Sequence, residues 1–241
     1  MAQNTIYLIG AGIAGCEGLS CKALEAIGNA EVLVGRQRHL DRFPNFPGHK
    51  MVLGELPPLL AFLQATDKPV AVLATGDPNF FGTGRFLLRN LPKERLEIFA
   101  NVTSMQYAFA RIKEPWDDAV FLSLQGRGIG PSLDKIVAAE KACVLTDEIN
   151  TPAAVARELL NRGAEGYDAW VCEDLGMETE KFTRTSVKGL LTLQHSELNI
   201  LILIRTYEPN PTQYPLIGID DDQFASLKKL FTRQEVRAVT L

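Results

Sequence analysis

The chain has 241 residues, of which 46% are hydrophobic and 22% are charged. This composition excludes a largely disordered chain, and the length predicts one or two globular domains. A formal net charge of -4 argues against a surface that coats nucleic acid. No apolar run approaches the ~20 residues of a membrane span. Because the N-terminus also lacks the basic region of a secretory signal, we expect a cytoplasmic protein with neither membrane nor nucleic-acid partners.

The cysteines and histidines show no spacing that is typical of a metal site. The 4 cysteines include no pair separated by two residues, and the 3 histidines are far apart. Isolated cysteines usually behave as small buried apolar side chains in a reducing compartment. We therefore predict neither a bound metal nor a disulfide.

Strands and helices alternate along the first half of the chain. Short apolar runs that end near glycine predict buried parallel strands, and apolar side chains spaced three or four residues apart predict helices. The strands are expected at residues 6–9, 31–35, 70–74 and 96–99. The helices are expected at about residues 19–27, 57–66, 82–91 and 104–112, with a loop rich in Arg, Phe and Pro at residues 36–50.

The alternation restarts after a polar break at residues 113–118. Strands are expected at residues 119–124, 143–145, 169–172 and 200–204, with helices at residues 132–141 and 152–161. This pattern predicts an α/β fold with two domains, residues 1–114 and 115–207, each a mostly parallel sheet flanked by helices. Residues 208–241 hold three prolines and an acidic run, so we expect a linker there.

Residues 10–15 read GAGIAG directly after the first strand. Glycines let a backbone approach a ligand closely, and the N-terminus of the following helix favours negative charge. A dinucleotide site would need an acidic residue at the end of the second strand to bind the ribose. Glu31 instead lies at the start of that strand, and the end reads Gly35-Arg36. A nicotinamide or flavin site and a tight turn without a ligand both stay open here.

A second glycine loop, GDPNFFGTG at residues 76–84, follows the most apolar strand. Ligands of open α/β sheets bind outside the carboxyl ends of the strands. Asp77 would repel a pyrophosphate, but it would accept a sulfonium cofactor with its ribose and amino acid. The structural alternative is a Gly-Pro turn against which Phe80 and Phe81 pack.

Three motifs together resemble the tetrapyrrole methylase family, S-adenosylmethionine methyltransferases with two α/β domains. GAGIA at residues 10–14 partly matches the family's G-x-G-P-G, with Ile13 and Ala14 in place of Pro and Gly. ATGDPNFFG at 74–82 and NVTSMQYAFAR at 101–111 are similar to S-G-D-P-x-F-F-G and P-x-V-S-S-x-Q-x-A-F-A-R. The resemblance covers about residues 5–206. It implies the two-domain tetrapyrrole methylase fold with the cofactor in a cleft between the domains.

Within the family, the chain is most similar to the branch that methylates precorrins at C5 in cobalamin synthesis. The matching segments are WDDA at 116–119, SLQGR at 123–127, where Gln125 replaces the usual His, and EDLG at 173–176. The resemblance implies methyl transfer to the C5 bridging carbon of a precorrin-6 or precorrin-7 intermediate, and a homodimer. Residues 218–224 and 231–238 resemble the start of a module that methylates C15 and decarboxylates, which would be a fused or separate partner.

The resemblance also implies where the ligands lie. The expected cofactor contacts are Gly10, Gly12, Ile13, Gly76, Asp77, Phe80, Phe81, Thr103, Ser104 and Leu124. Because a precorrin carries many carboxylates, cations on nearby loops are expected to bind it, namely Arg36, Arg38, Arg85, Arg111 and Arg127. No catalytic residue is assigned. The alternatives are another tetrapyrrole methylase, an oxidoreductase that uses residues 10–15, and a scaffold without catalysis.

Overall fold

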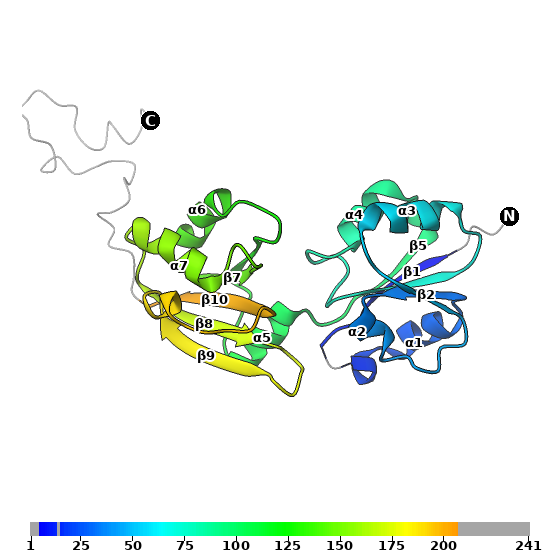
Figure 1. Ribbon diagram of the computed structural model, residues 1–241, viewed down its shortest axis with the longest axis horizontal. Helices are drawn as coiled ribbons and strands as arrows, with labels where there is room; N and C mark the ends of the chain where they lie inside the picture. The colour runs from blue at the N-terminus through cyan, green and yellow to red at the C-terminus, as the bar shows by residue number, and fades with distance from the viewer. Residues whose placement is uncertain (1–4, 14, 207–241) are drawn as a thin grey trace, which may run out of the picture.

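The computed structural model describes residues 5–13 and 15–206, so the predicted linker and module start at residues 208–241 lie outside the described residues. Figure 1 shows two α/β halves, each built on one sheet. The first sheet is wholly parallel and has the strand order β3-β2-β4-β1-β5. Its strands are β1 (Ile6–Gly10), β2 (Val32–Gly35), β3 (His49–Val52), β4 (Val70–Ala74) and β5 (Leu96–Phe99).

Helices cover both faces of the first sheet, as Figure 1 shows. One face carries α1 (Cys21–Gly28) and α2 (Gln37–Leu40), and the other carries α3 (Leu56–Ala65) and α4 (Gly84–Asn90). Short 3-10 turns, η1 (Gly15–Gly18) and η2 (Lys93–Arg95), complete this half. Burial on both sides explains why the central strands are continuous apolar runs: every residue of β4 is buried. The expected loop at residues 36–50 instead contains α2 and the start of β3.

The second sheet has the order β6-β7-β10-β8-β9 and is mixed. Its strands are β6 (Ala119–Ser123), β7 (Lys141–Leu145), β8 (Tyr167–Glu173), β9 (Lys181–Ser186) and β10 (Asn199–Arg205). Only β6 and β7 pair in parallel, whereas the other three pairings are antiparallel. The prediction of two mostly parallel sheets is therefore wrong for this half. The turn at residues 174–180 is too short for a crossover helix, so β8 and β9 form a hairpin.

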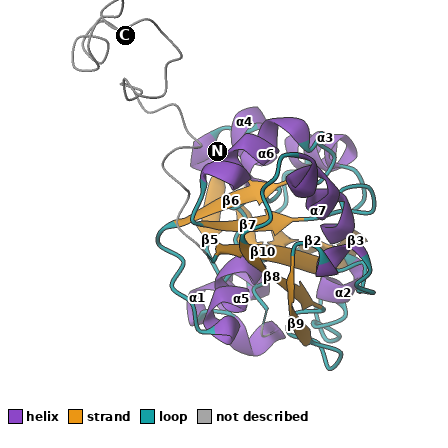
Figure 2. Cartoon of the chain, turned by 90° about the vertical axis from the view of Figure 1, so that its left-hand side faces the viewer, coloured by secondary structure: helices purple, strands orange, loops and turns teal. Residues whose placement is uncertain are grey.

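Helix α5 (Ser104–Ile112) connects the two halves. It follows β5 of the first sheet, but Met105, Ala108 and Phe109 pack against Cys143 and Cys172 of the second sheet. On the opposite face lie α6 (Gly130–Ala138) and α7 (Pro152–Asn161), as Figure 2 shows, and η3 (Gly189–Leu191) packs beside α7. A helix that precedes the break at residues 113–118 thus belongs to the second core.

Among the described residues, 5–13 and 15–206, no helix is long and apolar enough to cross a membrane. In the same residues, no three His, Cys, Asp or Glu side chains lie close enough together to hold a metal ion. Cys21, Cys143 and Cys172 are free thiols. Burial raises the pKa of the Cys143 thiol and raises that of Cys172 to about 12, so both thiols stay protonated and inert at neutral pH.

The packing of α5 predicts the effect of removing its largest buried side chain. Phe109 is 0% exposed, so Phe109→Ala should lower the free energy of unfolding by about 3–5 kcal/mol. Urea denaturation measures this loss. Val102 is 49% exposed, and Val102→Ala should change stability by less than about 0.5 kcal/mol. Equal stability of the two variants would show that α5 is not anchored on the second sheet.

Candidate ligand-binding cleft

A cavity of about 420 Å³ is lined by residues from both halves of the chain. This volume falls within the ~300–1,000 Å³ of typical small-molecule sites. The first half lines it with the loops that follow β1 and β4, with α2 and its flanking arginines, with the connection between β3 and α3, and with the start of α5. The second half lines it with Gln125 after β6, the ends of β7 and β8, the turn that follows β8, and the start of β10. The cavity therefore lies at the carboxyl ends of parallel strands, where ligands of open α/β sheets bind.

The two glycine loops contact each other directly at this edge. Gly12 N donates to Gly76 O at 3.5 Å, and Ala11 N donates to Ala74 O at 2.7 Å. A Cβ atom at Gly10 would lie 2.4 Å from Gly76 O, and Gly12 and Gly76 both have φ near +60° (60° and 62°). A side chain at Gly10 would force the two loops apart, and the positive φ of Gly12 and Gly76 favours glycine at these two positions. The glycines are thus required by the fold itself, besides any contact with a ligand.

Asn101 holds the first glycine loop in place. Its Nδ2 donates to Gly10 O at 2.9 Å and to Gly18 O at 3.0 Å, and its Oδ1 accepts from Val102 N at 2.8 Å. The adjoining Thr103 caps α5: Gln106 N donates to Thr103 Oγ1 at 3.1 Å, and Thr103 N donates to Gln106 Oε1 at 3.0 Å. Asn101 belongs to the motif at residues 101–111, but the sequence predicts no role for it, because its partners Gly10 and Gly18 are distant in the chain.

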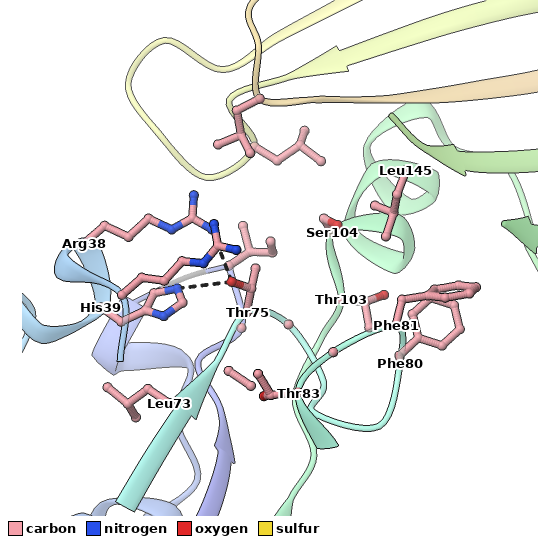
Figure 3. Close-up of a pocket in the computed structure, with 18 of the residues that line it drawn as sticks. Arg38, His39, Leu73, Thr75, Phe80, Phe81, Thr83, Thr103, Ser104 and Leu145 are labelled. Atoms are coloured by element: carbon pink, nitrogen blue, oxygen red, sulfur yellow. Dashed lines mark hydrogen bonds between the residues drawn. The ribbon is translucent and has the colours of Figure 1, made fainter. Parts of the chain in front are cut away.

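Most of the predicted cofactor contacts line the cavity, namely Gly12, Ile13, Gly76, Phe80, Phe81, Thr103 and Ser104. Figure 3 shows Thr103 and Ser104 at the start of α5, with Phe80 and Phe81 beside them. Gly10, Asp77 and Leu124 are not among the lining residues. Leu124 is fully buried in the core of the second half. Asp77 folds back on its own loop, where its Oδ1 accepts from Asn79 N at 2.8 Å.

Basic side chains gather at one end of the cavity, on and beside α2. Arg36, Arg38 and Arg42 line it together with His39. Arg38 Nη2 donates to Thr75 Oγ1 at 3.2 Å, and His39 Nε2 lies 3.5 Å from the same oxygen (Figure 3). Burial, and then the charges of the three arginines, lower the pKa of His39 from 6.5 to about 4. The imidazole is therefore neutral at pH 7, and the positive charge of this end comes from arginine.

The remaining predicted substrate ligands lie elsewhere. Arg85 and Arg127 line a second cavity of about 210 Å³, which is also lined by Phe80, Phe81 and Gly82 of the main cavity. Arg111 lines neither cavity. Its Nε lies 3.2 Å from a carboxylate oxygen of Glu180, and its guanidinium lies over the ring of Phe182. The structure thus brings Arg36 and Arg38 together, places Arg85 with Arg127, and sets Arg111 apart.

A polar network fixes the strand ends that the second half contributes. Thr146 Oγ1 donates to Asn199 Oδ1 at 2.8 Å, and Asn199 lines the cavity. Glu173 Oε1 accepts from Ser196 N at 2.7 Å, and Asp174 Oδ1 accepts from Ser196 Oγ at 2.7 Å. These bonds link the end of β8 to the loop before β10. The sequence does not predict the roles of Asn199 and Ser196, because their hydrogen-bond partners Thr146, Glu173 and Asp174 are distant in the chain.

Strand β2 lacks the acidic residue at its carboxyl end that a dinucleotide site requires to bind the ribose. Glu31 precedes the strand and forms an ion pair with Lys68 at 3.4 Å. The opposite end of β2 is Gly35, and the next residue, Arg36, lines the cavity. The acidic side chain that would bind a ribose is thus at the wrong end of the strand.

The family model described as "Tetrapyrrole (Corrin/Porphyrin) Methylases" matches residues 5–191. The chain therefore belongs to the tetrapyrrole methylase family. It is 35% identical over 178 residues to a cobalt-precorrin-7 C(5)-methyltransferase of Salmonella typhimurium, with 73% of this chain and 88% of that protein covered. It is 28% identical over 245 residues to a precorrin-6Y C(5,15)-methyltransferase [decarboxylating] of Sinorhizobium sp, with 98% of this chain and 58% of that protein covered.

A solved structure supports the fold. The uroporphyrin-III C-methyltransferase of Thermus thermophilus, complexed with S-adenosyl homocysteine, superposes with a TM-score of 0.67 at 23% identity. The match covers 84% of this chain and 98% of that one. The predicted two-domain tetrapyrrole methylase fold is confirmed, apart from the antiparallel pairings of the second sheet.

The role of Asp77 in its loop can be tested directly. Asp77→Ala removes the acceptor for Asn79 N, so amide exchange in residues 78–84 should accelerate about twofold to tenfold. Asp77→Asn should stay close to the wild type, because an Asn side chain accepts the same bond. Hydrogen exchange measured by mass spectrometry separates the variants. If both variants exchange like the wild type, this hydrogen bond does not hold the loop.

His39 predicts a specific pH dependence of stability. Its pKa in the folded chain is about 4, below the 6.5 of an unfolded His. Between these values the unfolded state takes up a proton that the folded state does not, so stability should fall as the pH falls from 6.5 to 4. Urea denaturation across this range should show a smaller fall in His39→Asn. The same slope in both proteins would contradict the buried, neutral imidazole.

Proposed function

We propose that the chain is an S-adenosylmethionine-dependent C-methyltransferase that methylates the C5 bridging carbon of a precorrin in cobalamin biosynthesis, at the precorrin-6 or precorrin-7 level. The observation that carries the proposal is the cavity at the carboxyl ends of β1 and β4, which joins the two glycine loops to a cluster of arginines. The 35% sequence identity with the cobalt-precorrin-7 C(5)-methyltransferase of Salmonella typhimurium supports this branch of the family. The oxidoreductase alternative is disfavoured by the position of Glu31.

The cavity fits a cofactor with an adenosine and an amino acid. Phe80, Met177 and Leu198 supply apolar wall, and the Thr103 and Ser104 hydroxyls supply polar groups beside the capped start of α5. Gly12, Ile13, Gly76 and Phe81 complete the proposed contacts on the glycine loops. Gly10, Asp77 and Leu124, which do not line the cavity, are not included among the proposed contacts. The sulfonium methyl is electrophilic as supplied, so the cofactor brings the chemistry of the transfer.

The protein's part is to bind and align. We assign the precorrin carboxylates to Arg36 and Arg38 at one end of the cavity, because arginine pairs with carboxylates through parallel hydrogen bonds. We also propose that Arg85 and Arg127, which line the second cavity with Phe80 and Phe81, bind further carboxylates of this large substrate. Holding the bridging carbon in line with the methyl group is then the main contribution to rate.

The proposal extends to assembly and location. We propose that the protein works as a homodimer in the cytoplasm and that residues 208–241 are a linker and the start of a C15-methylating, decarboxylating module. The alignment with the Sinorhizobium protein, whose name includes both methylations, supports the module, because it covers 98% of this chain but only 58% of that protein. Light scattering of the purified protein tests the dimer.

Calorimetry with S-adenosylhomocysteine and with NAD(P) tests the class of enzyme. We expect binding of the first and none of the second. Tight dinucleotide binding without S-adenosylhomocysteine binding would favour the oxidoreductase, and no binding of either would favour a scaffold. Turnover of precorrin-6 and precorrin-7 substrates, with and without cobalt, then tests the substrate, with the methylated carbon assigned by nuclear magnetic resonance.

Arg38 gives the sharpest test of the substrate end. Arg38→Ala removes a cation from the cavity, so the KM for the precorrin should rise about tenfold or more while S-adenosylhomocysteine affinity stays unchanged. Steady-state kinetics at saturating methyl donor measures the KM. Arg89, an exposed residue of α4 outside both cavities, provides the control, and Arg89→Ala should behave as the wild type. A loss of cofactor affinity in Arg38→Ala would mean that the arginines face the cofactor.

A further inference from the structure

Glu180 joins helix α5 to the turn between β8 and β9 (residues 174–180, called the β8–β9 turn). Its Oε2 accepts from Gly176 N at 2.7 Å. Its Oε1 lies 3.2 Å from Arg111 Nε and accepts from the Tyr107 hydroxyl at 3.4 Å. The Glu180 side chain is only 14% exposed, whereas that of Arg111 is 55% exposed. One largely buried carboxylate thus holds both the backbone of the turn and two side chains of α5.

The β8–β9 turn forms part of the wall of the main cavity. Leu175 and Met177 line it, on either side of Gly176. Gly176 has φ of 77°, and a Cβ atom there would lie 2.4 Å from Ile13 Cγ2 and 2.8 Å from Ile13 O. The turn of the second half is therefore packed against the first glycine loop. The turn therefore forms the cavity wall beside the first glycine loop.

We propose that Arg111 is a positioning residue: through Glu180 it holds the β8–β9 turn against Ile13, and it thereby sets the affinity for the cofactor. The inference rests on the proposed function, in which S-adenosylmethionine occupies this cavity. When the ion pair is removed, the turn spends less time in the closed position. The apparent dissociation constant then rises in inverse proportion to the closed fraction.

The contacts of Arg111 favour arginine over lysine. The Arg111 guanidinium carbon lies 5.7 Å from the ring centroid of Phe182, two residues beyond Glu180 on the chain. A planar guanidinium can bind the carboxylate and stack on the ring at the same time, which an ammonium cannot do as well. Arg111→Lys should therefore keep the ion pair but only part of the effect.

Arg184 provides a closely matched control. It lies on β9, its side chain is 61% exposed, and it forms an ion pair with Asp168. Its guanidinium carbon lies 5.8 Å from the ring centroid of Trp170. Neither Asp168 nor Trp170 lines the main cavity or belongs to the β8–β9 turn. Like Arg111→Ala, Arg184→Ala therefore removes one ion pair and one contact between a guanidinium and an aromatic ring. Neither of the contacts of Arg184 involves the β8–β9 turn.

The experiment measures S-adenosylhomocysteine affinity by calorimetry in the full chain. Arg111→Ala should weaken binding about threefold to tenfold, the range expected for an exposed ion pair with a stacked ring. Arg111→Lys should fall between this variant and the wild type, and Arg184→Ala should match the wild type. Glu180→Gln should weaken binding like Arg111→Ala, and the double variant should lose little more, because the two residues act as one unit.

Two further readouts separate positioning from general structural damage. Amide exchange at residues 174–178 should accelerate in Arg111→Ala but not in Arg184→Ala. At saturating methyl donor, the kcat and the precorrin KM of Arg111→Ala should equal those of the wild type. An increased precorrin KM with unchanged cofactor affinity would overturn the inference and make Arg111 a substrate ligand, as the sequence predicts.

The inference and the proposed function fail in different ways. If the wild type does not bind S-adenosylhomocysteine, the proposed function fails. If the wild type binds but Arg111→Ala binds equally well, the positioning role fails and the proposed function stands. Unchanged amide exchange in the β8–β9 turn of Arg111→Ala would overturn the positioning role, whatever the binding measurements show.

Discussion

The site depends on the close contact of two backbone loops at one edge of the parallel sheet. The loops after β1 and β4 pair closely because Gly10 carries no side chain and because Gly12 and Gly76 adopt a positive φ, which favours glycine. Asn101 ties the first of these loops to the segment that leads into α5. Since the capped start of α5 also lines the cavity, the loop pairing and the Asn101 side chain together position both glycine loops and the start of α5.

The two halves of the molecule contribute to the site by different means. The parallel sheet provides strand ends and loops at one edge, as doubly covered sheets generally do. The mixed sheet provides the β8–β9 turn and the start of β10, which side-chain hydrogen bonds hold in place. Helix α5 belongs to the first half by sequence order and to the second by packing. Helix α5 is therefore the element that fixes the second half to the end of β5 in the first half.

Charge is distributed unevenly in this protein. The whole chain has a formal charge of -4, yet one end of the cavity is lined by three arginines and a neutral His39. Arg38 and Arg42 are half-buried and Arg36 is exposed, so water screens the charges of Arg38 and Arg42 less than it screens that of Arg36. Under the proposed function, this local positive charge lets an acidic protein bind a substrate rich in carboxylates.

The sequence by itself determined the alternation of most strands and helices, though not α2, β3 or β9, and it identified seven of the ten predicted cofactor contacts as residues that line the cleft. Apolar runs and glycines report local backbone requirements, so Gly12, Gly76 and the Phe80-Phe81 pair were predicted where the structure has them. Only the tertiary structure decided the antiparallel pairing of β8, β9 and β10, the docking of α5, and the partner of Arg111. Asn101 and Glu180 were missed for the same reason. Their roles depend on groups that are brought close only by folding, and no local pattern records such contacts.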